Sequence, residues 1–442
     1  MAPMPAFRRV SAALFVWVLA TGAWVAAQGL SANDAHRVHQ MLREAYDSVR
    51  QNYYDTTFHG LDLDARFREY DDKLKSAASL NAGLTVIAAF LDGLKDSHTY
   101  FMPPARPYRL DYGYRLAPIG DQVFVTRVRP GTDAAAKVRA GDQLLALDGG
   151  PVTRDTFQTM EYLLNVLSPR QTTHLRLRDP AGAEREVAVD TKVVPGRQLR
   201  NLTGAGAGIE FNDMEREQEA DERMYRQQYI EIGDVMIWKM PIFLLDNSLA
   251  DKLFAIARKH STLILDLREN PGGLIESLRR MTGNLFDRDV KIADRVTRKG
   301  RTQIVAKSRG SSAFSGKLIV LVDSGSGSSA ELLARVVQLD KRGVVLGDRS
   351  AGAVMETLMF PFAQGDEVMI FYGFAVTDAD LVMGDGRSLE RAGVSPDEKL
   401  LPSAADLAAG RDPVMARAAQ LAGLTLDPVA AGKLFPFEWR PF

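Results

Sequence analysis

The feature that most constrains the fold is a series of short apolar runs, separated by helical stretches, after residue 229. The runs read VMIWKMPIF, TLILDL, KLIVLV and RGVVLG, a composition typical of strands buried on both faces. Stretches such as LIESLRRMTGNL and AELLARVVQL, with apolar residues at helical spacing, lie between them. The pattern predicts an α/β core in which helices cover a mostly buried sheet.

Two strand–turn–helix units of this core carry residues suited to chemistry. In the first, Gly272 and Gly273 follow a strand and open a helix, where uncovered backbone N–H groups could receive a developing oxyanion. In the second, the turn SGSGSSAE at 324–331 places a serine at the start of a helix. Each turn also has a simpler explanation, a glycine required by the backbone or a serine N-cap. Ligands of open α/β sheets bind beyond the carboxyl ends of the strands, so both turns could face one crevice.

A serine nucleophile needs a general base, and the chain has six histidines. Five of them lie in helical or strand contexts with no catalytic neighbour, and we interpret them as surface or structural residues. His98 lies in the polar turn LKDSHTYFMPP, where Asp96 and Ser97 precede it and can orient an imidazole. The spacing alone does not pair His98 with the serine-rich turn.

The chain before residue 229 has a different texture. Residues 31–95 have helical spacing of apolar residues, and residues 108–196 alternate apolar and polar positions in short strands around one helix. The second stretch predicts a small β-barrel with a helix, a plausible peptide-binding module. Residues 200–228 are first glycine-rich and then highly charged, which is typical of a connector.

Composition excludes several classes of function. The 55 basic residues balance 56 acidic ones, and no long stretch is strongly basic, which argues against nucleic acid as a partner. The absence of cysteine excludes disulfides, a thiolate nucleophile and cysteine metal sites. We predict neither a metal site nor a cofactor.

The N-terminus predicts export. Arg8 and Arg9 precede an apolar stretch that ends in small residues before Gln28, the layout of a secretory signal peptide cleaved after Ala27. The mature protein is then expected to be periplasmic or extracellular. An uncleaved segment would instead tether it, and that would be its only predicted membrane contact.

Five sequence motifs follow one another along the chain: LKDSHTYFMPP, LILDLRENPGG, VDSGSGSSAELLA, LGDRSAGA and RAGVSPD. In this order they resemble the C-terminal-processing, or tail-specific, serine peptidases and their tricorn-like relatives. The stretch KVRAGDQLLALDG resembles a PDZ domain of the kind these enzymes carry. The resemblance covers nearly the whole mature chain. It implies an α/β fold with a ClpP/crotonase-like βα catalytic core, an N-terminal helical region and an inserted PDZ domain, acting on a peptide or protein substrate.

The resemblance also implies domain boundaries. They are a signal peptide at 1–27, a helical region with the His98 turn at 28–107, a PDZ domain at 108–198, a connector at 199–228, a catalytic core at 229–401, and a C-terminal helix and tail at 402–442.

The family motifs assign roles residue by residue. The nucleophile would be Ser328, three positions before a glutamate. The tail-specific branch carries a catalytic lysine where this chain has Ala353, so the Ser-Lys dyad is absent. The tricorn-like pattern supplies His98 as the base, with Ser97 and Glu390 as the relay that orients it.

The remaining assignments follow from the same resemblance. The oxyanion donors would be the backbone N–H groups of Gly272 or Gly273 and of Ser329. The PDZ substrate loop would be YGYRL, that is Tyr112, Gly113, Tyr114, Arg115 and Leu116.

Two other readings stay open. The first is a catalytically inactive PDZ scaffold that binds envelope proteins, which the retention of all four catalytic residues disfavours. The second is an esterase or acyl transferase that uses the same machinery. The sequence does not decide the oligomeric state, or whether the PDZ domain recruits substrate or gates the site.

Overall fold

The computed structural model describes residues 30–195, 224–365 and 369–440. The predicted signal peptide and most of the predicted connector lie outside these residues. Within them, no helix combines the length and the apolar character needed to cross a membrane.

The first described region is helical, as predicted. Serine or aspartate caps each of its three main helices, because the side chains of Ser31, Asp62 and Ser79 accept a backbone N–H of the first turn. The apolar faces of these helices share one core with two strands described below. The elements are α2 (Ala32–Asn52), the 3₁₀ turn η1 (Phe58–Gly60), α3 (Leu63–Lys75) and α4 (Leu80–Asp92).

Residues 108–195 form a separate unit, which we call the β block. The predicted alternating strands are present and enclose an apolar core of their own. The first and last strands of the block, β2 (Tyr108–Asp111) and β9 (Lys192–Pro195), pair antiparallel, so the block begins and ends at one stem. Its other elements are β3 (Tyr114–Ile119), β4 (Gln122–Val128), α5 (Asp133–Lys137), β5 (Gln143–Leu147), β6 (Gly150–Pro151), α6 (Arg154–Tyr162), the π-helical turn η2 (Leu163–Leu167), β7 (Thr172–Arg178) and β8 (Glu184–Asp190).

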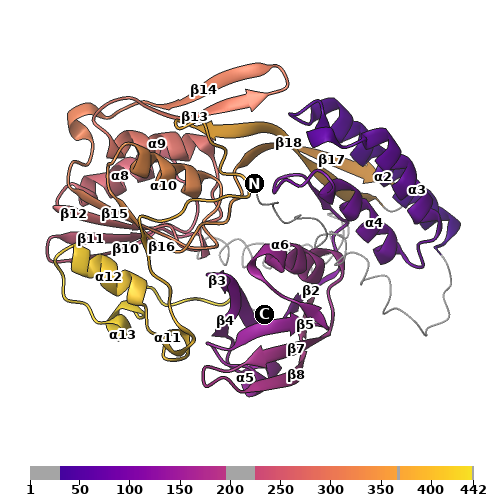
Figure 1. Ribbon diagram of the computed structural model, residues 1–442, viewed down its shortest axis with the longest axis horizontal. Helices are drawn as coiled ribbons and strands as arrows, with labels where there is room; N and C mark the ends of the chain where they lie inside the picture. The colour runs from indigo at the N-terminus through magenta and orange to yellow at the C-terminus, as the bar shows by residue number, and fades with distance from the viewer. Residues whose placement is uncertain (1–29, 196–223, 366–368, 441–442) are drawn as a thin grey trace, which may run out of the picture.

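The α/β core is built on a six-stranded sheet, and the predicted buried strands are its members (Figure 1). Pairing is parallel from the second strand onward, as expected for strands joined by helices. The order is β10 (Gln228–Ile232), β11 (Val235–Lys239), β12 (Thr262–Asp266), β15 (Lys317–Val322), β16 (Val344–Gly347) and β19 (Glu398–Lys399).

Helices cover both faces of this sheet. One face packs on α8 (Asn247–Ala257), α9 (Ile275–Leu285) and α10 (Ser329–Leu339). The other face packs on the C-terminal helices α12 (Pro413–Leu421) and α13 (Pro428–Ala431), which follow the short α11 (Ala404–Ala408). Burial on both faces explains why the strands read as continuous apolar runs.

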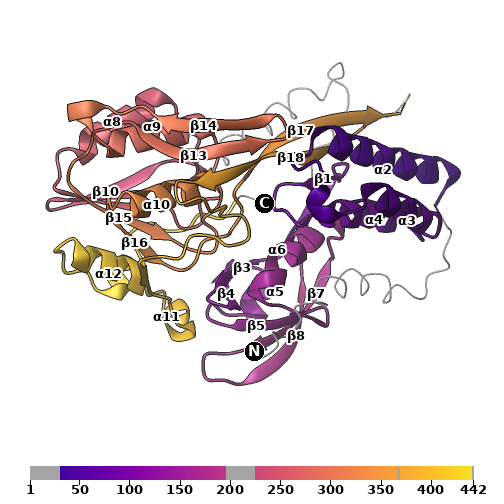
Figure 2. The same cartoon turned by 45° about the horizontal axis from the view of Figure 1, so that its top comes forward.

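A second sheet was not predicted, and it joins the helical region to the core. Its longest strand, β18 (Ile370–Met383), pairs with β17 (Met355–Gln364) and β13 (Val290–Thr297), and β13 continues to β14 (Gly300–Ala306). The short β1 (Tyr100–Met102), directly after the His98 turn, adds to β18. Figure 2 shows β17 and β18 extending from the core to the N-terminal helices. The 3₁₀ turn η3 (Gly310–Ser312) follows β14.

A buried ion pair joins the β block to the core. Arg154, at the start of α6, donates to Asp348 over 2.8 Å, and the two side chains are only 9% and 7% exposed. Gly120 of the block donates its N–H to the same carboxylate oxygen at 2.8 Å. Arg154 also donates to the carbonyl of Ser350, at 3.2 Å. The block is therefore fastened to the loop that follows β16.

We expect Asp348→Ala to lower the free energy of unfolding by about 3–5 kcal/mol, because Arg154 would remain buried without its counter-charge. Urea denaturation measures this change. Glu184→Ala is the matched control: it breaks the exposed pair with Arg178 in the same block and should cost about 0.5 kcal/mol or less. Equal costs for the two variants would contradict the interpretation.

Candidate active site

The serine-rich turn bends sharply between β15 and α10, and Ser328 lies at its tightest point. Ser328 has φ 50° and ψ −117°, a conformation that non-glycine residues rarely adopt. Its N–H donates to the carbonyl of Ala353 at 2.9 Å. Such a strained residue persists only where its surroundings hold it, and such residues gather at functional sites.

The carboxylate of Glu331 supplies that support. It is fully buried, and it accepts hydrogen bonds from the Ser328 N–H at 3.0 Å and from the Ala353 N–H at 2.9 Å. Its other oxygen accepts from Ser350 Oγ at 2.5 Å and from the Gly352 N–H at 2.7 Å. Burial raises the pKa of Glu331 to about 7, while these four donors act in the opposite direction. Sequence reasoning used this glutamate only as a marker for the serine.

The His98 turn contains a continuous hydrogen-bonded chain. Ser97 Oγ lies 2.7 Å from His98 Nδ1 and donates to Glu390 Oε2 at 2.8 Å. The Ser97 N–H donates to the other Glu390 oxygen at 2.7 Å. Burial lowers the pKa of His98 below 6.5, and the nearby Asp96 charge partly opposes this. The structure thus brings together three of the four predicted catalytic side chains.

The carboxylate of Asp96 accepts several hydrogen bonds that stabilise the His98 turn. One carboxylate oxygen accepts the N–H groups of His98 and Thr99, at 2.9 and 2.7 Å, and also the hydroxyl of Thr377 on β18 at 2.7 Å. The other oxygen accepts from the buried hydroxyl of Tyr53 at 2.8 Å.

A second histidine, His59, is linked to Asp96 through Tyr53. The Tyr53 hydroxyl lies 3.0 Å from His59 Nε2. We interpreted His59 from the sequence as a surface or structural residue, and its link to Asp96 through Tyr53 was missed. Nothing in the local sequence indicates that these segments meet.

The segment 353–354 joins the two halves of the site. The Ala353 carbonyl accepts the Ser328 N–H, and the Val354 N–H donates to Glu390 Oε2 at 2.9 Å. Ser328 Oγ and His98 make no direct hydrogen bond in the part of the chain that the structure describes. Contacts of this kind are often long without substrate and shorten when it binds.

The two predicted oxyanion glycines differ in the structure. The Gly272 N–H already donates to Asn270 Oδ1 at 2.8 Å, so the prediction of Gly272 as a donor is not supported. Instead, Gly272 permits close approach: with φ +100°, a Cβ there would lie 2.6 Å from Ser328 Cβ. The N–H groups of Gly273 and Ser329 have no hydrogen-bond partner among the described residues.

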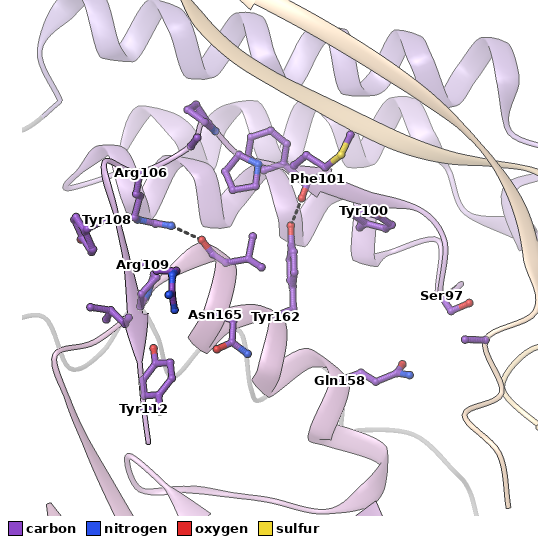
Figure 3. A pocket seen from close by; sticks show the side chains of 18 residues that line it. Ser97, Tyr100, Phe101, Arg106, Tyr108, Arg109, Tyr112, Gln158, Tyr162 and Asn165 are labelled. Atoms are coloured by element: carbon purple, nitrogen blue, oxygen red, sulfur yellow. Dashed lines mark hydrogen bonds between the residues drawn. The ribbon is translucent and has the colours of Figure 1, made fainter. Parts of the chain in front are cut away.

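A cavity of about 710 Å³ begins at this site (Figure 3). Ser97 and Ala353 line one part of it, while Tyr112 and Tyr162 of the β block line another. The Tyr162 hydroxyl donates a hydrogen bond to the carbonyl of Phe101 on β1, so this bond connects the β block to β1 at the cavity. Most of the other lining residues are aromatic, proline or aliphatic.

The predicted substrate loop is only partly accessible. Tyr112 lines the cavity and Arg115 is exposed. Gly113 adopts φ +72° and donates its N–H to Asp111 at 2.9 Å. Tyr114 is buried with its hydroxyl 3.1 Å from Thr173, and Leu116 packs against the same core. The Tyr114 side chain belongs to the block's interior, so any contact of this residue with substrate would have to come from its backbone.

No cluster of histidine, aspartate and glutamate suited to a metal ion occurs in residues 30–195, 224–365 or 369–440. The site contains a serine hydroxyl, a group that can attack a carbonyl, and a buried imidazole, a group that can accept a proton.

Comparison with known proteins supports a serine peptidase. Residues 215–400 match the model of peptidase family S41, and residues 34–82 match the tricorn protease C1 domain. The carboxyl-terminal-processing peptidase 3 of Arabidopsis thaliana, a chloroplastic protein, is 21% identical over 83% of this chain and 69% of its own length.

Two solved structures show the same fold. Mature CPAF complexed with lactacystin matches with a TM-score of 0.62 and 18% identity, over 85% of this chain and 96% of that one. The photosystem II D1 C-terminal processing protease matches with a TM-score of 0.52 and 20% identity, over 84% and 94%. Residues 215–400 include the main sheet and Ser328, so this part of the chain is a serine-peptidase domain of family S41, and relatives that match along most of the chain are named carboxyl-terminal-processing peptidases.

Proposed function

We propose that the protein is an exported serine endopeptidase that cleaves peptides or unfolded, C-terminal segments of proteins, with Ser328 as nucleophile and His98 as base. The observation that carries the proposal is the chain Glu390–Ser97–His98, with contacts of 2.8 and 2.7 Å. An imidazole held at Nδ1 presents Nε2 as the proton acceptor. Ala353 occupies the position where a Ser-Lys enzyme would carry its base.

The reaction would follow the usual two acyl-transfer steps. Ser328 Oγ attacks the scissile carbonyl while His98 Nε2 takes its proton, and the imidazolium then protonates the leaving amine. Glu390 stabilises the imidazolium through Ser97. The N–H groups of Gly273 and Ser329 are the proposed donors to the oxyanion. Water, activated by His98, then releases the acyl group from Ser328.

The β block, residues 108–198 in this assignment, would be a PDZ domain that holds substrate or gates the site. Two observations support a role close to catalysis. The cavity at Ser97 is partly lined by the block's Tyr112 and Tyr162. Arg154 of the block donates to the Ser350 carbonyl, and Ser350 Oγ in turn donates to Glu331. A movement of the block would therefore disturb the loop that supports Ser328.

Ser328→Ala and His98→Ala should each abolish cleavage of a complex peptide library by residues 28–442, with new termini read by mass spectrometry. We expect each substitution to lower turnover by about 10⁴-fold or more, since nucleophile and base act as a unit. His39→Ala, on α2 away from the site, is the control and should leave cleavage unchanged. Cleavage that survives His98→Ala would place the base elsewhere, and no cleavage by the unsubstituted protein would favour the inactive scaffold.

The acid limb of kcat/KM should have its midpoint below pH 6.5, because burial lowers the pKa of His98 and only the neutral imidazole accepts a proton. Asp96→Asn removes the charge that raises this pKa, so the midpoint should move to still lower pH. Glu331, whose pKa is about 7, does not contact Asp96, so a limb due to Glu331 would stay in place. A midpoint that rises in Asp96→Asn would contradict the assignment of His98.

Gly272→Ala should lower kcat/KM by about 100-fold or more, because the new methyl group would displace Ser328 and small misplacements are costly. Gly131→Ala is the matched control. Gly131 also has positive φ, +73°, but a Cβ there meets nothing within 4 Å. It should cost only about 1 kcal/mol of stability and leave kcat/KM intact. Equal losses of activity in the two variants would show that backbone strain, and not contact with Ser328, is responsible.

A further inference from the structure

The end of the described chain crosses from the core to the β block. Leu434 and Phe435 pack with the C-terminal helices against the main sheet. Beyond them, Phe437 lies against Arg115 of β3 and Arg127 of β4, and residues 439–440 contact Arg129, which follows β4 directly. The C-terminal helices already lie beside the block, since a Cβ on Gly141 would meet the carbonyl of Ala404 in α11 at 2.4 Å. Figure 1 and Figure 2 both place α11 near β4.

Two aromatic rings in this segment rest against arginines. The guanidinium of Arg127 lies 4.3 Å from the centre of the Phe437 ring, and that of Arg115 lies 5.3 Å from it. Arg129 lies 5.7 Å from the Trp439 ring and donates to the carbonyl of Arg440 at 2.7 Å. These distances are those of cation–π contacts. The two rings also meet edge to face, with centroids 5.2 Å apart.

The C-terminal segment has a defined direction relative to β3 and β4. Arg115 on β3 and Arg127 on β4 are paired residues of the antiparallel ladder, so both face the same side. The segment passes Arg127 with Phe437 and Arg129 with Arg440, so it runs along β4 and antiparallel to β3. It thus approaches the predicted substrate loop, where the Arg129 N–H donates to the carbonyl of Gly113 at 2.8 Å.

The contact is of a kind that a competitor can displace. Among the described residues, no backbone hydrogen bond joins residues 436–440 to β3, which remains an edge strand of its sheet. Cation–π contacts at exposed sites are individually weak, and of the three arginines Arg115 is exposed while Arg129 is buried. A segment tethered in the same chain nevertheless stays bound, because its effective concentration is high. A free peptide that also paired with the edge of β3 would gain the backbone bonds that the tail lacks.

We infer that Arg115, Arg127 and Arg129 form a docking site for extended peptide segments with aromatic side chains at alternate positions, and that residues 437–440 are its resident occupant. Substrate segments of this chemistry bind by displacing the tail. The inference rests on the proposed function only in taking the β block as the part that binds substrate.

Binding is tested without relying on catalysis. In a Ser328→Ala background, a variant ending at Pro436 keeps the packed Phe435 and lacks the docked rings. A fluorescent synthetic peptide, FPFEWRPF, is titrated into it and followed by anisotropy. We expect saturable binding to this variant, and binding at least about tenfold weaker to the full chain. Arg127→Ala in the shortened protein should weaken binding by a further factor of about five or more, and so should serine at both aromatic positions of the peptide.

A second variant guards against misfolding of the shortened protein. The full-length double substitution Phe437→Ser and Trp439→Ser keeps the chain length and should bind the peptide like the shortened protein. With Ser328 intact, either change should lower KM for peptides with alternating aromatic residues while kcat stays the same, and added FPFEWRPF should raise KM again.

Three results would overturn the inference. The first is that the peptide binds neither the shortened variant nor the double-serine variant, and the second is that it binds the full chain equally well. The third is that truncation abolishes cleavage and the free peptide restores it, because the tail would then have a structural role. If no variant cleaves any substrate but the binding results are as expected, the proposed function fails and the docking site stands.

Discussion

The buried carboxylate of Glu331 is the interaction on which the site depends. Four donors converge on it, three of them backbone N–H groups, so it fixes the start of α10 and the loop after β16 in one arrangement. Charge-assisted bonds in a buried setting are strong, and removing the acceptor would leave several buried donors unsatisfied. The unusual backbone of Ser328 is stable only because this carboxylate and the Ala353 carbonyl hold its N–H. In its ionised form, which burial disfavours by raising the pKa to about 7, the carboxylate also interacts favourably with the N-terminus of α10.

The loop after β16 also connects Ser328 to the half of the site that contains His98. Ala353 faces Ser328, and the next residue, Val354, donates to Glu390, which in turn holds Ser97. His98 belongs to the N-terminal region, more than two hundred residues from Ser328 in sequence, and reaches the site because β1 pairs with β18. The β block is fastened to this loop through Arg154 and Asp348. Two distant segments and an inserted block therefore meet at one short loop, which makes the geometry of the site sensitive to the position of each.

The sequence predicts the parts that depend on local pattern. The four central strands of the main sheet, the helical character of residues 31–95 and the strands of the β block follow from the spacing of apolar residues, and the resemblance supplied Ser97, His98, Ser328 and Glu390. The second sheet was missed because β18 pairs, besides its hairpin partner β17, with β1 and β13, which lie far away in the chain.

Some features of the site could not be found from the sequence at all. Gly272 is not a suitable oxyanion donor because Asn270 already accepts its N–H, and the burial of the Tyr114 ring in the block's core was not predicted. The support of Asp96 by Tyr53, and the docking of Phe437 on Arg127, depend on tertiary contacts that leave no local signal.

The central claim is that Ser328 is a nucleophile activated by His98, and covalent labelling tests it most directly. The protein is treated with a fluorophosphonate, the modified residue is located by mass spectrometry, and the rate of labelling is compared between the unsubstituted protein, His98→Ala and Glu390→Gln. The account predicts labelling at Ser328 alone, a rate that falls by orders of magnitude in His98→Ala, and a smaller decrease in Glu390→Gln. Labelling at another serine, or an unchanged rate at Ser328 without His98, would contradict it.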